Sequence, residues 1–173
     1  AAGEVVERPS SVIKELTENA LDAGATTVEI EIADGGSSYM RVSDNGSGMS
    51  EEDAKKSIIR HGTSKISSIE DIFSITSLGF RGEAVPSIAA VSELVMTTRM
   101  NDTDLAFRMV LSGGSVKEEE HTGASVGTTM EVRNLFFNTP ARKKFMKSER
   151  TESSKISDII TKLALTRPDV AFT

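Results

Sequence analysis

The chain has 173 residues, of which 38% are hydrophobic and 27% charged, as in an ordinary soluble globular domain with its own core. The formal net charge of −6 argues against a protein that binds nucleic acid through overall positive charge, although a local basic patch remains possible. The lack of cysteine excludes disulfides and zinc–thiolate sites. No apolar run approaches the roughly 18 residues of a membrane span, and no secretory signal is present.

The first part of the chain predicts a helix followed by a hairpin. Pro9 marks the start of a helix over residues 9–23, and Gly24 ends it. Strict alternation over residues 27–33 predicts a half-buried strand, and residues 39–43 form the strand that returns beside it. A second helix is expected after Ser50, because three acidic residues follow this N-cap signal.

The remainder predicts further strands flanked by helices. A loop over residues 60–68 and a short helical piece over 69–73 precede an apolar helix that runs through Ala90. Thr139 and Pro140 begin another helix, and residues 152–165 form the last one. Helices with an antiparallel-rich sheet, not in strict alternation, predict an α+β two-layer sandwich with a mixed, mostly antiparallel sheet. The four later strands are expected at about residues 93–99, 105–111, 115–119 and 128–133, with a hairpin turn at 113–114.

A row of polar residues on the first helix is the strongest chemical signal. Glu15, Asn19 and Asp22 fall within roughly 60° of one helix face, beside the apolar stripe. A carboxylate four residues before a carboxamide suits phosphate hydrolysis, because the carboxylate can orient and deprotonate water. The amide oxygen can ligate Mg²⁺ without adding negative charge beside phosphates. Taken alone, the row is more typical of a solvated helix face, and the rest of the chain has to support the chemical interpretation.

The segment Asp44-x-Gly46-x-Gly48 suits recognition of a purine base. A carboxylate accepts a hydrogen bond from the exocyclic amino group of adenine, and glycines let a base lie against bare backbone. Guanine presents a carbonyl at that position and is repelled. Asp-Asn-Gly is also a common turn, which is the alternative when the segment is considered alone.

Two further segments suit phosphate and base contacts. Gly79 and Gly82 precede a helix, and a glycine turn before a helix N-terminus directs free N–H groups at an anion. The segment is neither a Walker loop nor a dinucleotide fingerprint, because neither consensus follows. Residues 61–65 supply hydroxyls and a cation, and Thr128 can place a hydroxyl or a water near a base. Each segment by itself is also typical of a plain loop or strand start.

Four motifs, taken together and in this order, resemble the ATPase superfamily that groups gyrase, a heat-shock chaperone, histidine kinases and MutL. They are the polar row of the first helix, Asp44-x-Gly46-x-Gly48, the pair of Gly79 and Gly82, and Thr128 with the glycine before it. Residues 1–9, 78–84 and 134–145 narrow the resemblance to the MutL family of DNA mismatch-repair proteins, over essentially the whole chain. The resemblance implies a Bergerat-type ATP-binding fold, with helices on one face of the sheet and ATP between helices and sheet.

The resemblance also implies roles for individual residues. Glu15 is expected to be the general base, Asn19 the Mg²⁺ ligand and Asp44 the residue that reads adenine, while Asp22 lies near the base or supports backbone under the site. The residues around the two glycines at 79 and 82, with Thr63 and Ser64, are expected to form a phosphate lid. The full ATP-binding set implied is Asn19, Asp22, Asp44, Gly46, Gly48, Thr63, Ser64, Leu78, Gly79, Phe80, Arg81, Gly82, Glu83, Ala84 and Thr128.

The resemblance further implies partners and missing parts. ATP and Mg²⁺ would order the lid and drive homo- or heterodimerisation, with DNA and a mismatch-recognition protein as partners, no membrane, and a bacterial cytoplasm or a eukaryotic nucleus as location. We expect residues 1–173 to be one ATP-binding domain, a fragment without its N-terminal segment, second ATPase subdomain and C-terminal dimerisation region, and therefore weak in binding and hydrolysis. The candidates for DNA contact are Arg142, Lys143, Lys144 and Lys147.

Two alternative functions remain open. A histidine-kinase-type phosphotransfer domain fits poorly, because only His61 and His121 are present and neither lies on an obvious phosphoacceptor helix. A nucleotide-independent DNA-binding scaffold is opposed by the acidic balance of the chain, and salt-dependent DNA binding without ATP would favour it.

Overall fold

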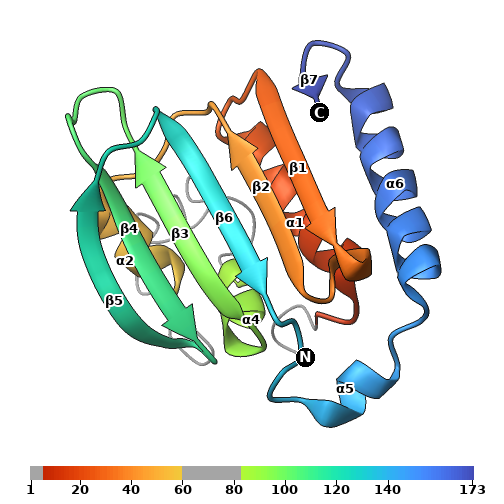
Figure 1. Cartoon of the computed structure of the whole chain (residues 1–173). Coiled ribbons are helices and arrows are strands. Elements are labelled where there is room, and N and C mark those ends of the chain that lie inside the picture. Colours follow the sequence, from red (N-terminus) through yellow and green to blue (C-terminus); the bar gives the residue numbers. More distant parts are fainter. Residues whose placement is uncertain (1–5, 60–82) are drawn as a thin grey trace, which may run out of the picture.

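A sheet of seven strands organises the chain in this computed structural model, which describes residues 6–59 and 83–173. The strand order is β5-β4-β3-β6-β2-β1-β7, and every neighbouring pair is antiparallel except β1 and β7. The helices α1, α2 and α4 lie behind one face of the sheet in Figure 1, and α6 packs along α1. The predicted α+β sandwich with a mixed, mostly antiparallel sheet is confirmed.

The predicted elements that fall in the described residues occur in the predicted order, and the short strand β7 was not predicted. The helices and the 3-10 turn are α1 (Pro9–Asp22), η1 (Asp34–Gly36), α2 (Glu51–Ser57), α4 (Ala84–Ala90), α5 (Pro140–Lys144) and α6 (Glu149–Thr166). The strands are β1 (Thr27–Ala33), β2 (Tyr39–Asp44), β3 (Glu93–Arg99), β4 (Ala106–Ser112), β5 (Ser115–Thr122), β6 (Gly127–Arg133) and β7 (Ala171–Phe172). The loop predicted at 60–68 and the helical piece at 69–73 lie outside the described residues.

The core lies between α1, α4 and the inner face of the sheet. The apolar stripe of α1 is buried as predicted, with Val12 and Ile13 fully covered. Met40 and Val42 alternate along β2 and face the same core, since successive strand residues point to opposite sides. Each large apolar side chain buried in this way contributes about 1.5–3 kcal/mol. The stripe therefore fixes which face of α1 meets the sheet, and with it the direction of the polar row.

Several element boundaries differ from the predictions by one to three residues. Helix α1 ends at Asp22, one residue before the predicted end. Helix α6 begins at Glu149, earlier than predicted, because Ser148 Oγ accepts a hydrogen bond from Thr151 N at 3.2 Å and caps the helix. Strand β5 continues to Thr122, because its ladder with β4 extends that far.

The two predicted helix starts behave differently. Ser50 caps α2 as expected, and its hydroxyl accepts a hydrogen bond from Asp53 N at 3.1 Å. Thr139 occupies the N-cap position of α5, but its side chain makes no capping bond, and its buried hydroxyl has no partner among the described residues. Thr139 therefore marks the start of α5 without capping it through its side chain.

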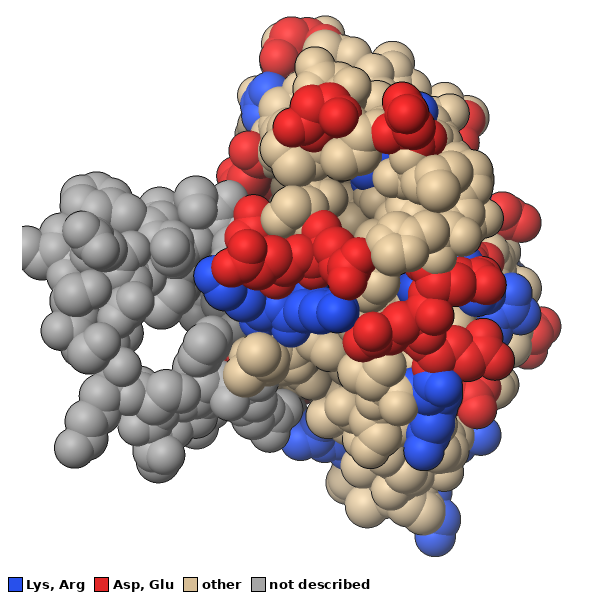
Figure 2. All heavy atoms as spheres, turned by 90° about the vertical axis from the view of Figure 1, so that its left-hand side faces the viewer, with Lys and Arg blue, Asp and Glu red and all other residues tan. Residues whose placement is uncertain are grey.

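Charged side chains cover the edge of the sheet at β5. Figure 2 faces this edge and shows acidic and basic side chains in adjoining groups. Glu51 of α2 lies 2.9 Å from Lys55 Nζ and 2.6 Å from His121 Nε2, so α2 is tied to β5. Charges on an edge strand oppose pairing with another chain, because an approaching strand would have to desolvate them.

The bend after β2 is held to β1 by a single side chain. Asn45 Oδ1 accepts hydrogen bonds from the backbone N–H groups of Thr26 and Thr27 at 2.8 and 2.9 Å, and its Nδ2 donates to Thr26 Oγ1 at 2.8 Å. The middle residue of the Asp-Asn-Gly turn thus fixes where the turn lies.

We predict that Asn45→Ala lowers the free energy of unfolding by about 1–2 kcal/mol, because three hydrogen bonds are lost, although all three lie at exposed positions. Urea denaturation measures the change. Asn101→Ala, in the exposed turn after β3, is the control and should stay within about 0.5 kcal/mol. Equal stability of the Asn45 variant and the unaltered chain would contradict the role given to this side chain.

Candidate functional site

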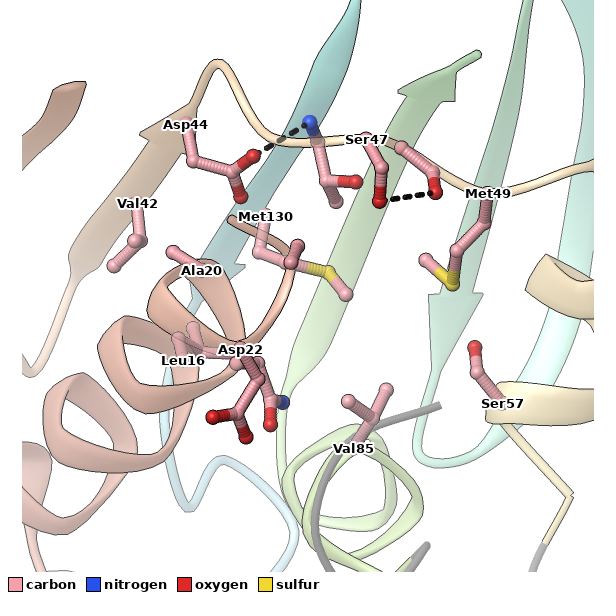
Figure 3. A pocket seen from close by; sticks show the side chains of 14 residues that line it. Leu16, Ala20, Asp22, Val42, Asp44, Ser47, Met49, Ser57, Val85 and Met130 are labelled. Atoms are coloured by element: carbon pink, nitrogen blue, oxygen red, sulfur yellow. Dashed lines mark hydrogen bonds between the residues drawn. The ribbon is translucent and has the colours of Figure 1, made fainter. Parts of the chain in front are cut away.

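A cavity of about 130 Å³ lies where α1, the end of β2, the loop before α2, α4 and β6 come together (Figure 3). Its lining mixes apolar side chains with a few polar groups, as is usual for small-molecule sites. The lining residues are Leu16, Asn19, Ala20, Asp22, Ala23, Val42, Asp44, Ser47, Gly48, Met49, Ser57, Val85, Thr128 and Met130.

Asp44 is the fixed polar group of this cavity. Its Oδ1 accepts hydrogen bonds from Gly46 N at 2.8 Å and from Thr128 N at 3.3 Å. Its Oδ2 accepts no hydrogen bond from the residues that the structure describes. Burial raises the pKa of the Asp44 carboxyl, and the two backbone N–H groups offset part of that rise. One oxygen is therefore held by the fold, and the other is available to a ligand.

The backbone approaches the Asp44 turn closely at two glycines. A side chain at Gly48, whose φ is +69°, would overlap the carbonyl of Arg99. A side chain at Gly127, whose φ is +126°, would overlap the carbonyl of Asp44. Only glycine adopts both conformations without strain, so β2, β3 and β6 can converge at this point. Gly127, like Gly48, leaves bare backbone next to the Asp44 turn. In the sequence, Gly127 is notable only as the residue before Thr128.

Three of the predicted polar residues meet at this cavity. Asn19 and Asp22 reach it from α1, and Thr128 reaches it from β6, opposite Asp44 in the sheet register. The Asn19 carboxamide makes no hydrogen bond with any described residue, so its oxygen is available as a ligand. Gly46 lies beside Asp44 through its N–H group.

Glu15 does not line this cavity. It lines a second recess of about 300 Å³, together with Lys14, Ala84 and Ile88 among others. Glu15 stands one helical turn before Asn19, and Ala84 and Ile88 of α4 line the same recess. Within the part of the chain that the structure describes, one cavity thus joins Asn19 and Asp44, and Glu15 lies outside it.

The predicted lid is largely outside the described residues. Thr63, Ser64, Leu78, Gly79, Phe80, Arg81 and Gly82 all lie there, as do His61 and Lys65. Glu83 occupies the N-cap of α4 without a side-chain capping bond, and Ala84 lines the recess of Glu15 rather than the main cavity.

Several lining residues were missed by sequence reasoning. Val42 stands two residues before Asp44, and Met130 two residues after Thr128, so both point to the same side of their strands as a predicted residue. The alternation of side chains along a strand, with a period of two residues, could have identified Val42 and Met130 as lining residues. Met49 and Val85 carry no such signal, because their place depends on how α2 and α4 pack.

Thr98 was also missed. It lies on β3, is 1% exposed, and its Oγ1 is 2.8 Å from Thr128 Oγ1. Met49 N donates to the same hydroxyl at 2.8 Å. A threonine in a strand is ordinary in sequence, and only the pairing of β3 with β6 reveals its position.

Other kinds of site find no support in the described residues. No helix among them is long and apolar enough to cross a membrane. Within the same ranges, no group of three His, Cys, Asp or Glu side chains is arranged to hold a metal ion.

Comparison with known proteins gives consistent results. The family described as histidine kinase-, DNA gyrase B- and HSP90-like ATPases matches residues 7–132. The chain is 55% identical over 173 residues to the DNA mismatch repair protein MutL of Citrifermentans bemidjiense, and 53% identical to that of Geobacter sulfurreducens. It spans 27% and 28% of the lengths of these two relatives.

Solved structures agree with the sequence matches. The Aquifex aeolicus MutL ATPase domain complexed with ADP superimposes with a TM-score of 0.78 at 37% identity, covering 98% of this chain and 60% of that one. The N-terminal domain of a DNA repair protein gives a TM-score of 0.82 at 31% identity, covering 99% of this chain and 50% of the other. The chain therefore belongs to the family of histidine kinase-, DNA gyrase B- and HSP90-like ATPases, and the relatives that it resembles over its whole length are MutL proteins.

Proposed function

We propose that this chain is the ATP-binding and ATP-hydrolysing region of a MutL-like DNA mismatch-repair protein. The proposal rests on the Asp44 carboxylate in a largely apolar cavity. Its Oδ1 accepts two backbone hydrogen bonds, and its Oδ2 accepts none from the described residues. Such a group accepts one hydrogen bond in a fixed direction, which is what recognition of an exocyclic amino group needs. The relative from Aquifex, whose ATPase domain is complexed with ADP, supports an adenine nucleotide as the ligand.

The apolar residues of the cavity suit the flat faces of a base. Val42, Met49 and Met130 lie around the space next to Asp44 (Figure 3). Methionine adapts to an aromatic surface because its side chain is unbranched and polarizable. Adenine bound here directs its amino group at Asp44 Oδ2, whereas guanine would present a carbonyl to a carboxylate and be rejected.

The polar row of α1 orders the rest of the nucleotide. Asp22, Asn19 and Glu15 follow one another along the helix, spanning roughly 10 Å from the first to the last at 1.5 Å per residue. The base lies at the Asp22 end, so the phosphates extend past Asn19 towards Glu15. In this arrangement Asp22 supports the base end of the site, and Glu15 holds and deprotonates the attacking water.

Asn19 fits a Mg²⁺ ligand. Its side-chain oxygen is a hard donor that no described residue occupies, and Asn19 lines the base cavity one helical turn after Glu15. Mg²⁺ is usually held by few protein groups together with phosphate oxygens and water, so the lack of an acidic cluster in the described ranges is compatible with it. When bound, Mg²⁺ supplies positive charge that stabilises the transferring phosphoryl group.

The proposal extends to the partners of the whole protein. ATP would order the lid and favour dimerisation, in response to a mismatch-recognition protein on DNA. Lys143, Lys144 and Lys147 are exposed and are the better candidates for DNA contact. Arg142 is a poorer candidate, because its Nη1 already donates a hydrogen bond to Val6 O at 3.3 Å.

The two alternative functions gain nothing from the structure. His121 lies on strand β5 and hydrogen bonds to Glu51, not on a phosphoacceptor helix. His61 lies outside the described residues. The edge that Figure 2 displays carries acidic groups beside its basic ones, and Lys55 is paired with Glu51 and Glu119, so this face offers no continuous basic surface for DNA.

Asp44→Asn should abolish adenine recognition while keeping the fold. The remaining oxygen can still accept from Gly46 N and Thr128 N, but an NH₂ group then faces the amino group of adenine. We expect ADP affinity to fall by about 10²-fold, and inosine diphosphate, which carries an acceptor there, to bind better than ADP. Titration calorimetry measures both, with the exposed Asp102→Asn as control; unchanged ADP affinity would remove the assignment.

The same group predicts how stability depends on pH. The pKa of Asp44 is raised in the folded chain above the unfolded value of about 3.9, so the folded state binds more protons between the two values. Stability contributed by this group therefore falls as pH rises through that window. In ligand-free protein, Asp44→Asn should be more stable than the unaltered chain at pH 7, and the difference should shrink towards pH 4. Urea denaturation at several pH values tests this, and a difference that is constant or reversed would refute it.

Glu15→Gln should separate binding from hydrolysis. The amide keeps the shape of the side chain but cannot accept a proton from water, so we expect ATP turnover in the full-length protein to fall by about 10²–10⁴. ADP affinity should change by less than about threefold, because Glu15 lies outside the base cavity. Glu18→Gln, whose carboxylate pairs with Lys14 on the same helix, is the matched control. Undiminished turnover by the Glu15 variant would exclude it as the base.

A further inference from the structure

We propose that Thr98 is a positioning residue that sets the hydroxyl of Thr128 as a hydrogen-bond donor towards the bound base. The inference rests on the proposed function, because it assigns part of the adenine selectivity to a residue that does not line the cavity. Thr98 is 1% exposed on β3, and it stands directly opposite Thr128 of β6 in the sheet register.

Three polar groups surround the Thr98 hydroxyl. Met49 N lies 2.8 Å away, Thr128 Oγ1 lies 2.8 Å away, and Gly127 O lies 3.3 Å away. The Met49 N–H can only donate, so it uses one lone pair of Thr98 Oγ1. The single proton of Thr98 is then left for either the Thr128 oxygen or the Gly127 carbonyl.

Either hydroxyl can donate across the 2.8 Å separation, so the direction of this bond depends on what else each hydroxyl can bind. Donation from Thr98 to Thr128 gives up only the contact of 3.3 Å with Gly127 O, which is long for a hydroxyl donor. An acceptor atom of the base in the cavity selects this arrangement, because it lets Thr128 donate to that atom. When Thr98 donates to Thr128, the proton of Thr128 is not used between the two side chains and can point into the cavity. The reverse arrangement would leave Thr128 with only lone pairs to offer. The chain of donors from Met49 N through Thr98 to Thr128 also polarises each bond in turn.

This donor complements Asp44. Asp44 and Thr128 are paired across β2 and β6, and Thr128 N donates to Asp44 Oδ1. An acceptor, Asp44 Oδ2, therefore stands next to a donor, the Thr128 hydroxyl, on one wall of the cavity. Adenine presents the matching pair, because its amino group is flanked by the acceptor nitrogens N1 and N7. Thr128 can reach one of these nitrogens directly or through one water.

The test compares ADP with 1-deaza-ADP and 7-deaza-ADP, which each lack one of the two ring acceptors. Binding is measured by calorimetry for the unaltered chain, Thr98→Val, Thr98→Ser and Thr129→Val. Valine keeps the shape of Thr98 without its hydroxyl, and serine restores the hydroxyl. Thr129→Val is the matched control, because Thr129 Oγ1 makes a similar bond of 2.8 Å to Ser43 Oγ and lies outside the cavity lining.

The unaltered chain should bind ADP about 3- to 10-fold more tightly than one of the two analogues, as expected for one hydrogen bond. Thr98→Val should bring that ratio close to one, while Thr98→Ser and Thr129→Val keep it. A ratio compares two ligands on the same folded protein, so a mere loss of stability would not change it.

Three results would overturn the inference. They are an unaltered chain that does not distinguish ADP from either analogue, a Thr98→Val variant that keeps the ratio, and a Thr129→Val control that loses it equally. If ADP binds and depends on Asp44 while any of these holds, only the role of Thr98 fails. If the unaltered chain does not bind ADP at all, the proposed function fails and this inference with it.

Discussion

The proposed site depends on one carboxylate held at the junction of two strands. Asp44 ends β2 in a place that burial makes unfavourable for charge, and the backbone N–H groups of Gly46 and Thr128 hold it there. Two strands and a loop can approach it so closely only because Gly48 and Gly127 have no side chains. Burial of the charged carboxylate therefore lowers the stability of the ligand-free chain at this point. A donor from a bound ligand would offset that cost, and groups with perturbed pKa values are typical of binding sites.

Helix α1 joins this junction to the chemistry expected of the family. Its apolar stripe is buried against the sheet, so the adjoining row of Glu15, Asn19 and Asp22 has a fixed direction. Asn19 and Asp22 reach the cavity of Asp44, while Glu15 reaches a separate recess next to α4. One helix thus borders two recesses, which the proposed function assigns to the base and to hydrolysis.

Local patterns were sufficient for much of the fold and for part of the site. Alternation predicted β1 to the residue, and the spacing of apolar residues predicted the face on which α1 is buried. The Asp44 turn and the polar row were visible because their residues are close in sequence. The start of α6 was misplaced because the cap at Ser148 competes with other serines nearby, and only the accepted bond from Thr151 identifies it.

What sequence patterns could not provide depends on contacts between distant segments. Thr98 acquires its place from the pairing of β3 with β6, and Asn45 from the approach of the turn to the start of β1. The separation of Glu15 from the cavity results from where α4 packs on α1. None of these relations has a period or a spacing that can be read along the chain.

A crystal structure of the chain with ADP is the most direct test of the central claim, because it locates the base. The account predicts adenine in the cavity of Asp44, with its amino group within hydrogen-bond distance of Oδ2 and its faces against Met49 and Met130. The phosphates should extend past Asn19 towards Glu15. Adenine bound elsewhere, or turned so that its amino group faces away from Asp44, would contradict it.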